Sequence, residues 1–517
     1  MNYLAKRKFG KVMWSFVCVI TLLLIDGQAV GQPQLDRLLA SDGMTNDFFG
    51  YSVSISGPPG NEVAIVGAKG DADNGVDSGS AYIFRRSGAS WVQEAKLLAS
   101  DGAASDVFGA SVSISGTPGN EVAIVGAYFD DMFLPAESGA AYIYRFNGVN
   151  WVEEQKLLAS DGAAGDKFGP VSIIGTAGNE VAIVGAWLDD DNGSNSGSAY
   201  IYRYNGVAWV EEAKLLASDG AADDLFGYSV SIGGPPGNEV AIVGAYKDDD
   251  IEAKSGSAYI YRFNGTTWVE EQKLLASDST FQNFFGYSVS ISGPTGNVVA
   301  IGRLPPSAVS GSAYIFRFNG VNWVEEQKLL TSNGTPGDQF GRSVSISGNA
   351  VIVGSFRDDD GSVRDSGSAY IFRFDGASWG EEQKLLNFNE RESDFFGFSV
   401  SIRGDIAIVG AIRDDFLAPD RGLAYSLTGL FVTELTGDCN SNGINDLHDL
   451  FVNKTSADCN DNGIPDECDI ASGVSVDVDV DGIPDECLAS CPPDVNSDGT
   501  VNVTDLLALL AAWGVCP

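Results

Sequence analysis

The chain consists mostly of one sequence unit that occurs seven times. The dipeptide Phe-Gly marks each copy, and successive copies start 55 to 60 residues apart. The glycines of these dipeptides are Gly50, Gly109, Gly169, Gly227, Gly286, Gly341 and Gly397. A fixed period of this length is typical of repeat architectures, in which each supersecondary unit packs against its neighbours. The fold therefore has to be built from seven similar units.

Each unit contains four short segments with the chemistry of β-strands. In the second unit these segments are Ser111–Ser115, Glu121–Ala127, Ala140–Phe146 and Trp151–Leu158. Gly, Pro, Asn and Asp separate them, and the Asn-Gly pair at 147–148 favours a hairpin. Glycine is enriched, with 63 residues in 517, which is above the usual share of roughly 7%. We predict an all-β fold of seven four-stranded antiparallel blades.

The two ends of the repeat region favour a closed ring over a solenoid. A solenoid needs polar caps at both ends, and none is visible in the sequence. Instead, residues Leu35–Asp42 repeat the sequence motif that ends the other units. The seventh unit lacks this motif and stops early, at Phe431–Leu435. We therefore predict that the N-terminal segment completes the last blade of a seven-bladed β-propeller spanning residues 32–437.

Net charge and histidine content exclude several classes of function. The formal charge of −39 argues against nucleic acid as a partner, because phosphate binding needs a basic surface. It also disfavours docking on an anionic membrane face. The single histidine, His448, argues against a Ser-His-Asp triad or a histidine-ligated catalytic metal.

Residues 1–31 are predicted to be a secretory signal peptide. Four basic residues between positions 6 and 11 precede an apolar run of 13 residues, Met13–Ile25, and small residues at 29–31 suit a cleavage site. The run is shorter than the roughly 20 residues of a membrane-spanning helix. No later segment suits a membrane span, so we expect a secreted, extracellular or cell-surface protein with no transmembrane segment after signal removal.

The last part of the chain differs in composition from the repeats. Residues 438–517 contain 14 Asp and 2 Glu against one Lys, together with all the cysteines outside the signal peptide. These cysteines are Cys439, Cys459, Cys468, Cys487, Cys491 and Cys516. An even number in an exported chain predicts disulfides, although the sequence leaves their pairing open.

Acidic residues gather in the loops that follow the second and fourth strands of each unit. Examples are Asp71 and Asp73 after a second strand, and Asp42 and Asp101 after fourth strands. Both kinds of loop emerge on one face of a four-stranded meander, so this face is expected to be negative. We expect mainly solvated loop charge there, with weak calcium binding as the alternative.

Other repeated polar and aromatic residues are expected to be structural. An Asp three positions before the Phe-Gly glycine, present in six units, favours a turn in which it bonds a backbone amide two residues on. The fourth-strand tryptophans are expected to pack between blades rather than stack on sugars. The third-strand arginines are expected to pair with glutamates of the adjacent strand. The tryptophans are Trp91, Trp151, Trp209, Trp268, Trp323 and Trp379; the arginines are Arg85, Arg145, Arg203, Arg262, Arg317 and Arg373.

Three units break the pattern in the loop after the second strand. The fifth has Gly302-Arg303-Leu304-Pro305-Pro306, the second inserts Met132-Phe133-Leu134-Pro135, and the seventh has Phe416-Leu417-Ala418-Pro419. These apolar segments are either exposed recognition tips or loops of relaxed sequence.

The combination of Phe-Gly, a glycine-turned hairpin and Val-Gly-Ala resembles the FG-GAP repeat, which forms the blades of the integrin α-subunit propeller. The resemblance covers residues 38–435. It implies a seven-bladed propeller that binds extracellular partners. Calcium-binding FG-GAP blades carry an Asp/Asn-rich loop between their first two strands. Here that place holds Gly57–Glu62 and its equivalents, with one carboxylate each, whereas Ca²⁺ takes about six to eight oxygen ligands.

The C-terminal region contains four candidate calcium loops. Residues 491–517 resemble one dockerin type I repeat, with Asp494–Gly499 opening the loop and an apolar helix after Asp505. Residues 438–490 resemble thrombospondin type 3 repeats. The predicted Ca²⁺ ligands are Asp438, Asn440, Asn442, Asp446, Asp449, Asp458, Asn460, Asn462, Asp466, Asp469, Asp477, Asp479, Asp481, Asp485, Asp494, Asn496, Asp498, Thr500, Asn502 and Asp505.

These features predict a non-enzymatic binding or adhesion protein. The propeller is expected to recognise an extracellular protein or glycan, and the Ca²⁺-binding tail to anchor the chain or dock on a cohesin-like or cell-surface partner. No catalytic residue and no specific ligand-binding residue is predicted. The alternatives are a glycosidase or lyase with an acidic catalytic pair, and a surface-layer or matrix component without a discrete ligand.

Overall fold

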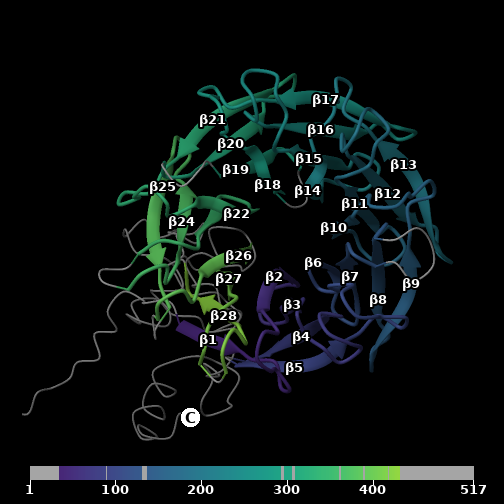
Figure 1. The fold of residues 1–517 in the computed structure, drawn as a ribbon, viewed down its shortest axis with the longest axis vertical. Coiled ribbons are helices and arrows are strands. Elements are labelled where there is room, and N and C mark those ends of the chain that lie inside the picture. Colours follow the sequence, from purple (N-terminus) through teal and green to yellow (C-terminus); the bar gives the residue numbers. More distant parts are fainter. Residues whose placement is uncertain are drawn as a thin grey trace, which may run out of the picture.

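The repeats fold into a closed ring of seven blades (Figure 1). The computed structural model describes residues 34–430, with gaps at 89, 131–136, 293–295, 305–308, 360–362, 388–390 and 417. Every sheet in this part of the chain has four strands, and every strand pair is antiparallel. The predicted all-β, seven-bladed propeller is confirmed.

Blades one to six each contain four consecutive strands. Blade one contains β2 (Phe49–Ser56), β3 (Val63–Ala68), β4 (Ser80–Ser87) and β5 (Ser90–Leu97). Blade two contains β6 (Ser111–Thr117), β7 (Asn120–Ala127), β8 (Ala140–Phe146) and β9 (Trp151–Leu157). Blade three contains β10 (Phe168–Ile174), β11 (Val181–Ala186), β12 (Ser198–Tyr204) and β13 (Trp209–Leu215).

Blade four contains β14 (Phe226–Gly233), β15 (Val240–Ala245), β16 (Ser257–Phe263) and β17 (Trp268–Leu274). Blade five contains β18 (Phe285–Ile291), β19 (Val298–Arg303), β20 (Ser312–Phe318) and β21 (Trp323–Leu329). Blade six contains β22 (Phe340–Ser347), β23 (Ala350–Ser355), β24 (Ser368–Phe374) and β25 (Trp379–Leu385). The first strand of each blade is innermost and the fourth is outermost.

Blade seven joins the two ends of the repeat region. It contains β26 (Phe396–Arg403), β27 (Ile406–Ala411) and β28 (Leu423–Thr428), and its outermost strand is β1 (Gln34–Leu38). β1 pairs antiparallel with β28, with Gln34 opposite Thr428 and Leu38 opposite Ala424. The Ser399 hydroxyl then donates to the Gly50 carbonyl at 2.7 Å, from blade seven to blade one. The predicted latch and ring closure are confirmed, and the solenoid is excluded.

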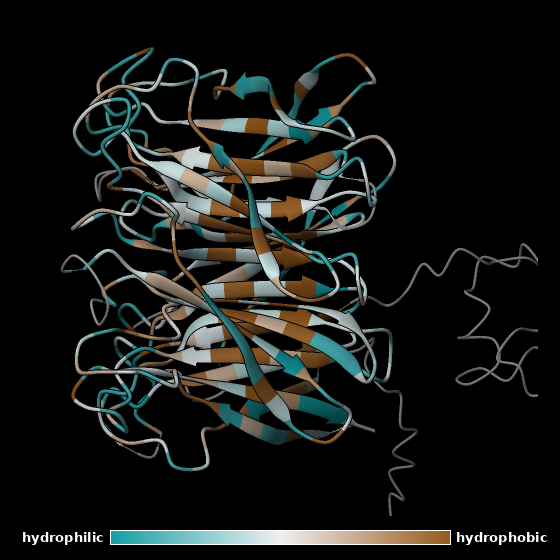
Figure 2. Cartoon of the chain, turned by 90° about the vertical axis from the view of Figure 1, so that its right-hand side faces the viewer, coloured by the Kyte–Doolittle hydropathy of each residue, from teal (hydrophilic) through white to brown (hydrophobic). Residues whose placement is uncertain are grey.

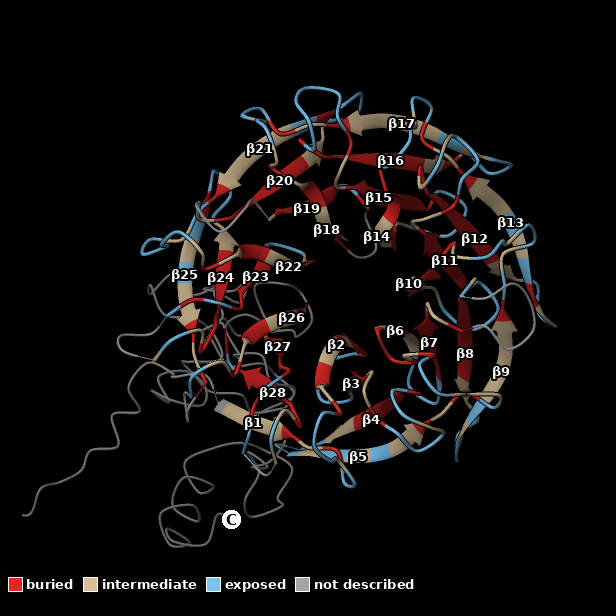
Figure 3. Ribbon diagram, in the orientation of Figure 1, coloured by how far each residue is buried: buried red, intermediate tan, exposed pale blue. Residues whose placement is uncertain are grey.

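The hydrophobic core lies between adjacent blades. Each cluster of buried side chains draws on two neighbouring blades, and one of them joins blade seven to blade one. Apolar residues dominate the strands, whereas hydrophilic residues gather in the loops at both ends (Figure 2). Apart from Asn120 at the start of β7, the second strands are buried along their whole length, whereas the outermost strands are partly exposed (Figure 3). This explains why the second strands read as continuous apolar runs, whereas the fourth strands contain charged residues at their centre.

A bulge in the innermost strand positions the residue that follows Phe-Gly. In blade one, Phe49 pairs with Ala68 and the next pair is Ser52 with Gly67, so Gly50 and Tyr51 stand between the two pairs. Gly50 has a φ of 89°, which an L-residue rarely adopts. The bulge places Tyr51 among the residues that line the central cavity. Phe-Gly is therefore a structural device that aims the next side chain at the centre of the ring.

Candidate functional site

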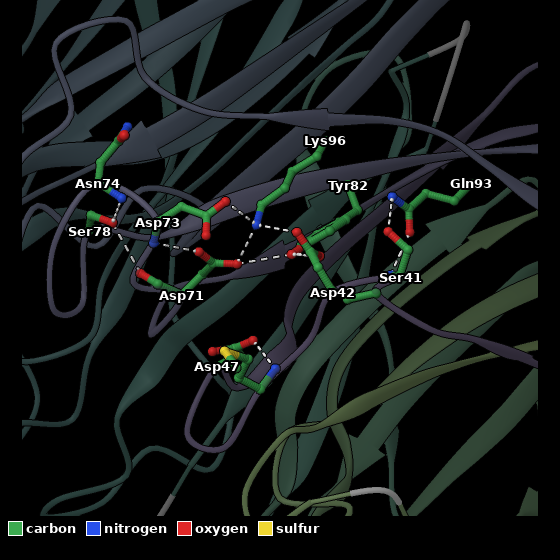
Figure 4. Close-up of polar contacts among 12 residues, drawn as sticks. Ser41, Asp42, Asp47, Asp71, Asp73, Asn74, Ser78, Tyr82, Gln93 and Lys96 are labelled. Atoms are coloured by element: carbon green, nitrogen blue, oxygen red, sulfur yellow. Dashed lines mark hydrogen bonds and ion pairs between the residues drawn. The ribbon is translucent and has the colours of Figure 1, made fainter.

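The acidic loops of blade one surround a lysine ammonium group. Lys96 Nζ lies 2.8 Å from Asp42, 2.9 Å from Asp71 and 2.7 Å from Asp73 (Figure 4). The Tyr82 hydroxyl lies 2.8 Å from Asp42 Oδ1 and 2.9 Å from Asp71 Oδ2. Despite partial burial, the pKa of Asp42 is held below its usual value by the hydrogen bonds from Lys96 and Tyr82. The ammonium group thus occupies the centre of this carboxylate cluster.

The same cluster recurs around the ring. Lys156, Lys214 and Lys273 each contact one carboxylate from the preceding blade and at least one from their own. The two kinds of acidic loop therefore lie on one face, as predicted. The prediction of solvated charge is wrong for the first Asp of each second-strand loop, because these residues are buried and hydrogen-bonded to the tyrosine of the third strand. They are Asp71, Asp130, Asp189, Asp248, Asp358 and Asp414.

Blade five departs from this arrangement. Arg303 takes the place of the small residue that ends the other second strands, which is alanine in five blades and Ser355 in blade six, and its side chain is buried. Its guanidinium donates to Asn283 and to the Tyr314 hydroxyl, and lies 3.7 Å from Asp278. The expectation of an exposed loop tip is wrong for Gly302 and Arg303, which belong to β19. The residues 305–308 that follow lie outside the described part of the chain.

The other two variant loops are only partly described. Residues 132–135 of the second unit and Leu417 of the seventh lie outside the described residues. Phe416 is exposed, and the Arg37 guanidinium lies 4.2 Å from its ring centroid. The Pro419 carbonyl accepts a hydrogen bond from Asn46 of the next blade. The first contact lies within blade seven, and the second joins blade seven to blade one.

The Asp that precedes Phe-Gly forms a turn, but in the opposite direction from the one predicted. Asp47 accepts a hydrogen bond from the Met44 amide, three residues before it, and Asp106 accepts one from Ala103 in the same way. Each closes the loop that leads into the innermost strand. The turn role is confirmed and the predicted partner is wrong, because the loop folds back before the aspartate rather than after it.

The arginine and tryptophan predictions are both confirmed. Arg85 donates to Glu94 on the adjacent strand at 3.0 Å and to Glu121 of the next blade at 2.6 Å. The indole of Trp151, in blade two, also donates a hydrogen bond to Glu94 of blade one. These residues form a belt between blades near the outer strands. They link neighbouring blades, as predicted, through hydrogen bonds and ion pairs.

A cavity of about 510 Å³ opens at the centre of the ring. Sequence reasoning missed it, although its lining could be found by aligning the residue after each Phe-Gly across the units. These residues are Tyr51, Ala110, Pro170, Tyr228, Tyr287, Arg342 and Phe398. Tyr128 and Trp187, which directly follow β7 and β11, complete the lining at the same end. This is the end that carries the acidic loops.

Seven side chains form an aromatic collar around the cavity, which we define as Tyr51, Tyr128, Trp187, Tyr228, Tyr287, Arg342 and Phe398. Ring centroids lie 5.1 Å apart for Tyr128 and Trp187, 5.9 Å for Trp187 and Tyr228, and 5.2 Å for Tyr228 and Tyr287. The Tyr228 hydroxyl donates to the Tyr287 hydroxyl at 3.1 Å. Arg342 and Phe398 continue the collar to Tyr51. Such edge and tilted contacts are favourable for aromatic pairs.

The described residues provide no obvious metal centre. Among residues 34–430, outside the gaps given above, no group of three or more His, Cys, Asp and Glu side chains is arranged to hold a metal ion. The predicted Ca²⁺ ligands from Asp438 to Asp505 and the six cysteines from Cys439 to Cys516 all lie outside the described part. So does the predicted signal peptide. The described segments contain no helix suited to crossing a membrane.

The ring, its blade landmarks and its central cavity define a seven-bladed β-propeller. The chain belongs to the FG-GAP repeat family, which matches residues 33–84, 91–144, 151–202, 209–261, 268–316, 323–372 and 379–427. No curated protein matches the chain in sequence.

Several solved structures are similar to this chain in fold. A fucose-specific lectin from Aleuria aurantia is 12% identical, with 66% of this chain and 97% of the lectin covered and a TM-score of 0.40. A second structure of that lectin, described as a six-bladed β-propeller, covers 65% of this chain and 95% of its own at 12% identity and a TM-score of 0.38. An α-L-arabinanase from Penicillium chrysogenum, complexed with arabinobiose, is 14% identical, with coverages of 62% and 93% and a TM-score of 0.42.

Proposed function

We propose that this chain is a secreted or cell-surface binding protein without enzymatic activity. Its propeller recognises an extracellular protein or glycan ligand at the collar. The observation that carries the proposal is the composition of the central cavity. Its lining combines aromatic rings, hydroxyl groups and one arginine, and no carboxylate is found among the lining residues that the structure describes. Sites of this size, mostly apolar with a few convergent polar groups, are typical of small-ligand binding.

The same composition disfavours the enzymatic alternative. A glycosidase of the common kind needs two carboxyl groups about 5 to 9.5 Å apart on either side of the scissile bond. A second cavity lies at the opposite end of the ring from the collar. Its described lining residues include one carboxylate, that of Glu239. This carboxylate accepts a hydrogen bond from Arg203 at 2.8 Å and belongs to the belt between blades. Neither cavity therefore supplies the pair.

The test is a binding array of glycans and matrix proteins, probed with the full-length chain, together with a turnover assay on the glycans that bind. We expect saturable binding without product release, weakened at least tenfold by Trp187→Ala. The control is Val207→Ala, because Val207 is 86% exposed on an outer hairpin. Released product would establish the enzyme, and self-assembly without a ligand would establish the matrix component. Either result would overturn the proposal.

We propose that residues 438–517 bind Ca²⁺ and anchor the chain. The support is the sequence alone: four loops with regularly spaced oxygen ligands and flanking cysteines. Calorimetry should show one fewer Ca²⁺-binding event in Asp498→Ala than in the wild type. Ser497→Ala is the matched control, because position four of such a loop does not supply a ligand. An unchanged stoichiometry in Asp498→Ala would contradict the assignment.

A further inference from the structure

Among the described residues, Arg342 is the one charged side chain that lines the central cavity. It is the third residue of β22, at the position where the other blades present Tyr, Phe, Ala or Pro. Its guanidinium carbon lies 4.3 Å from the Phe398 ring centroid, 5.1 Å from Tyr287 and 5.9 Å from Phe356. Contacts of this kind, within about 6 Å, hold a cation against ring faces. A guanidinium packed on a ring still presents the N–H groups in its own plane.

The described residues offer Arg342 no anionic partner. Arg85, Arg145 and Arg203 each contact two glutamates. Within the described segments, by contrast, Arg342 makes no ion pair and its guanidinium donates no hydrogen bond to the protein. Moving a charge out of water is unfavourable unless it is paired, and contacts with rings compensate only in part. The cavity therefore contains a partly desolvated cation that still lacks an anion.

A second cation strengthens the positive character of the collar. Lys69 Nζ lies 3.9 Å from the Tyr51 ring centroid. Burial alone would raise the pKa of Tyr51, but the positive charges of Lys69 and Arg342 outweigh it and hold this pKa below its usual value. Around the collar, each cluster of acidic loop residues is partly neutralised by its own lysine. Long-range repulsion from the acidic surface is screened beyond roughly 8 Å at physiological salt.

We infer that the collar binds a carboxylate-bearing sugar residue, of the uronic acid class, with its carboxylate on Arg342. This inference rests on the proposed binding function and specifies its ligand. Arginine recognises a planar carboxylate through two parallel hydrogen bonds. The C–H faces of a sugar ring pack on Trp187, Tyr128 and Phe398, and the hydroxyl groups of Tyr228 and Tyr287 are placed to bond the hydroxyl groups of the sugar.

The cavity suits a sugar better than an acidic peptide. An extended peptide needs backbone donors and acceptors, such as those of an open sheet edge. The innermost strands pair with their second strands, and serines on them bond the neighbouring blade, as Ser52 does with the Gly109 carbonyl at 2.7 Å. The groups left to a ligand are aromatic faces, phenol hydroxyls and one guanidinium. A cavity of about 510 Å³ lies in the usual range for small-ligand sites.

The test uses the full-length chain and calorimetric titration with trigalacturonate. The comparison ligands are its methyl ester, a sulfated trisaccharide and tetra-aspartate. We expect the acid to bind about 10- to 100-fold more tightly than the ester, because a hydrogen bond to a charged group is worth that much. Arg342→Gln should abolish this preference and Arg342→Lys should retain part of it. Arg364→Gln is the control, since Arg364 lies in the same blade and its side chain is 74% exposed.

The outcomes separate this inference from the proposed function. Equal binding of acid and ester by the wild type would overturn the inference, and this comparison needs no variant to fold. The inference would also be overturned if Arg342→Gln kept the preference for the acid over the ester. It would be overturned as well if only the sulfated trisaccharide or tetra-aspartate bound tightly. In these cases a Trp187-dependent ligand would still support the proposed function. Cleavage of trigalacturonate would overturn the proposed function itself.

Discussion

Gly67 of blade one lies so close to Gly109 of blade two that a Cβ on Gly67 would come within 1.9 Å of the Gly109 carbonyl oxygen. Gly67 belongs to a Val-Gly-Ala segment and Gly109 to a Phe-Gly dipeptide. The same approach occurs at every blade junction, including Gly410 against Gly50 where the ring closes. The two landmarks of the repeat are therefore two halves of one contact between blades.

Gly67→Ala should destabilise the propeller by about 3 kcal/mol or more, because neither backbone has room to retreat in a closed ring. Urea unfolding of the full-length chain measures the effect. Gly380→Ala is the matched control: Gly380 lies in an outermost strand, and a Cβ there would meet nothing within 4 Å. Equal stability of the two variants would show that the junction is looser than its geometry implies.

Lys96→Met should destabilise the chain by about 2 kcal/mol. The change leaves Asp42, Asp71 and Asp73 facing one another without a cation, and partial exposure of Lys96 moderates the cost through solvent screening. Adding Asp71→Asn should recover part of the loss, because it removes the most buried of the three charges. Denaturant unfolding of the single and double variants checks this. If the double variant is less stable than the single one, repulsion between the carboxylates is not the cause of the loss.

Asp394→Asn should raise the melting temperature near pH 7.5, and the gain should shrink toward pH 4.5. Burial, and then the charge of Asp414, raises the pKa of Asp394 to about 7. Between about pH 4 and this pKa, Asp394 is protonated in the folded state and ionised in the unfolded chain. The ionisation of Asp394 in the folded state therefore lowers the stability only as the pH rises through this range. Asparagine mimics the protonated form, and Asn283 already occupies the equivalent place in blade five.

Thermal melts of both proteins across this pH range test the prediction. Burial also raises the pKa of Asp47 and of Asp224 to about 6, so the wild type itself should gain stability as pH falls from about 7 to about 5. Below about pH 4 the trend should reverse, because the pKa values of Asp42 and Asp219 are lowered by their lysine and tyrosine partners despite partial burial. A melting temperature independent of pH would contradict both effects.

Leu38→Ala should weaken the closure of the ring. Leu38 is 1% exposed in the cluster that joins blades seven and one, and such a truncation costs about 2 to 5 kcal/mol. Loosening of β1 also uncovers the edge of β28, which favours association between chains. Melting and light scattering measure the two effects. Val149→Ala, at a position 78% exposed, should change neither.

Much of the fold follows from the repeat. The period, the four strand-like segments and the copied phrase at Leu35–Asp42 predicted the blade count, the strand order and the latch, because each expresses local chemistry that recurs. In the second unit, the predicted Ala140–Phe146 segment coincides with β8, and Trp151–Leu158 extends one residue beyond β9.

The lysine clusters and the collar were not predicted, because they join side chains that are far apart in sequence. Lys96 and Asp42 meet only when neighbouring blades pack, and the collar takes one residue from each of the seven blades. At the collar the aligned positions differ in chemistry from blade to blade. A search for residues that recur in every unit does not detect such positions. Blade six differs from the other blades at this position because it carries Arg342.

The pairing of β1 with β28 also sets an order in time. Thr428, the partner of Gln34, is synthesised almost 400 residues later, whereas in blades one to six each strand pairs with a strand next to it in the chain. Chains are synthesised at about 5 to 20 residues per second, so the first strand stays without its partner for at least about 20 seconds. The last step of folding therefore joins the oldest and the youngest parts of the ring.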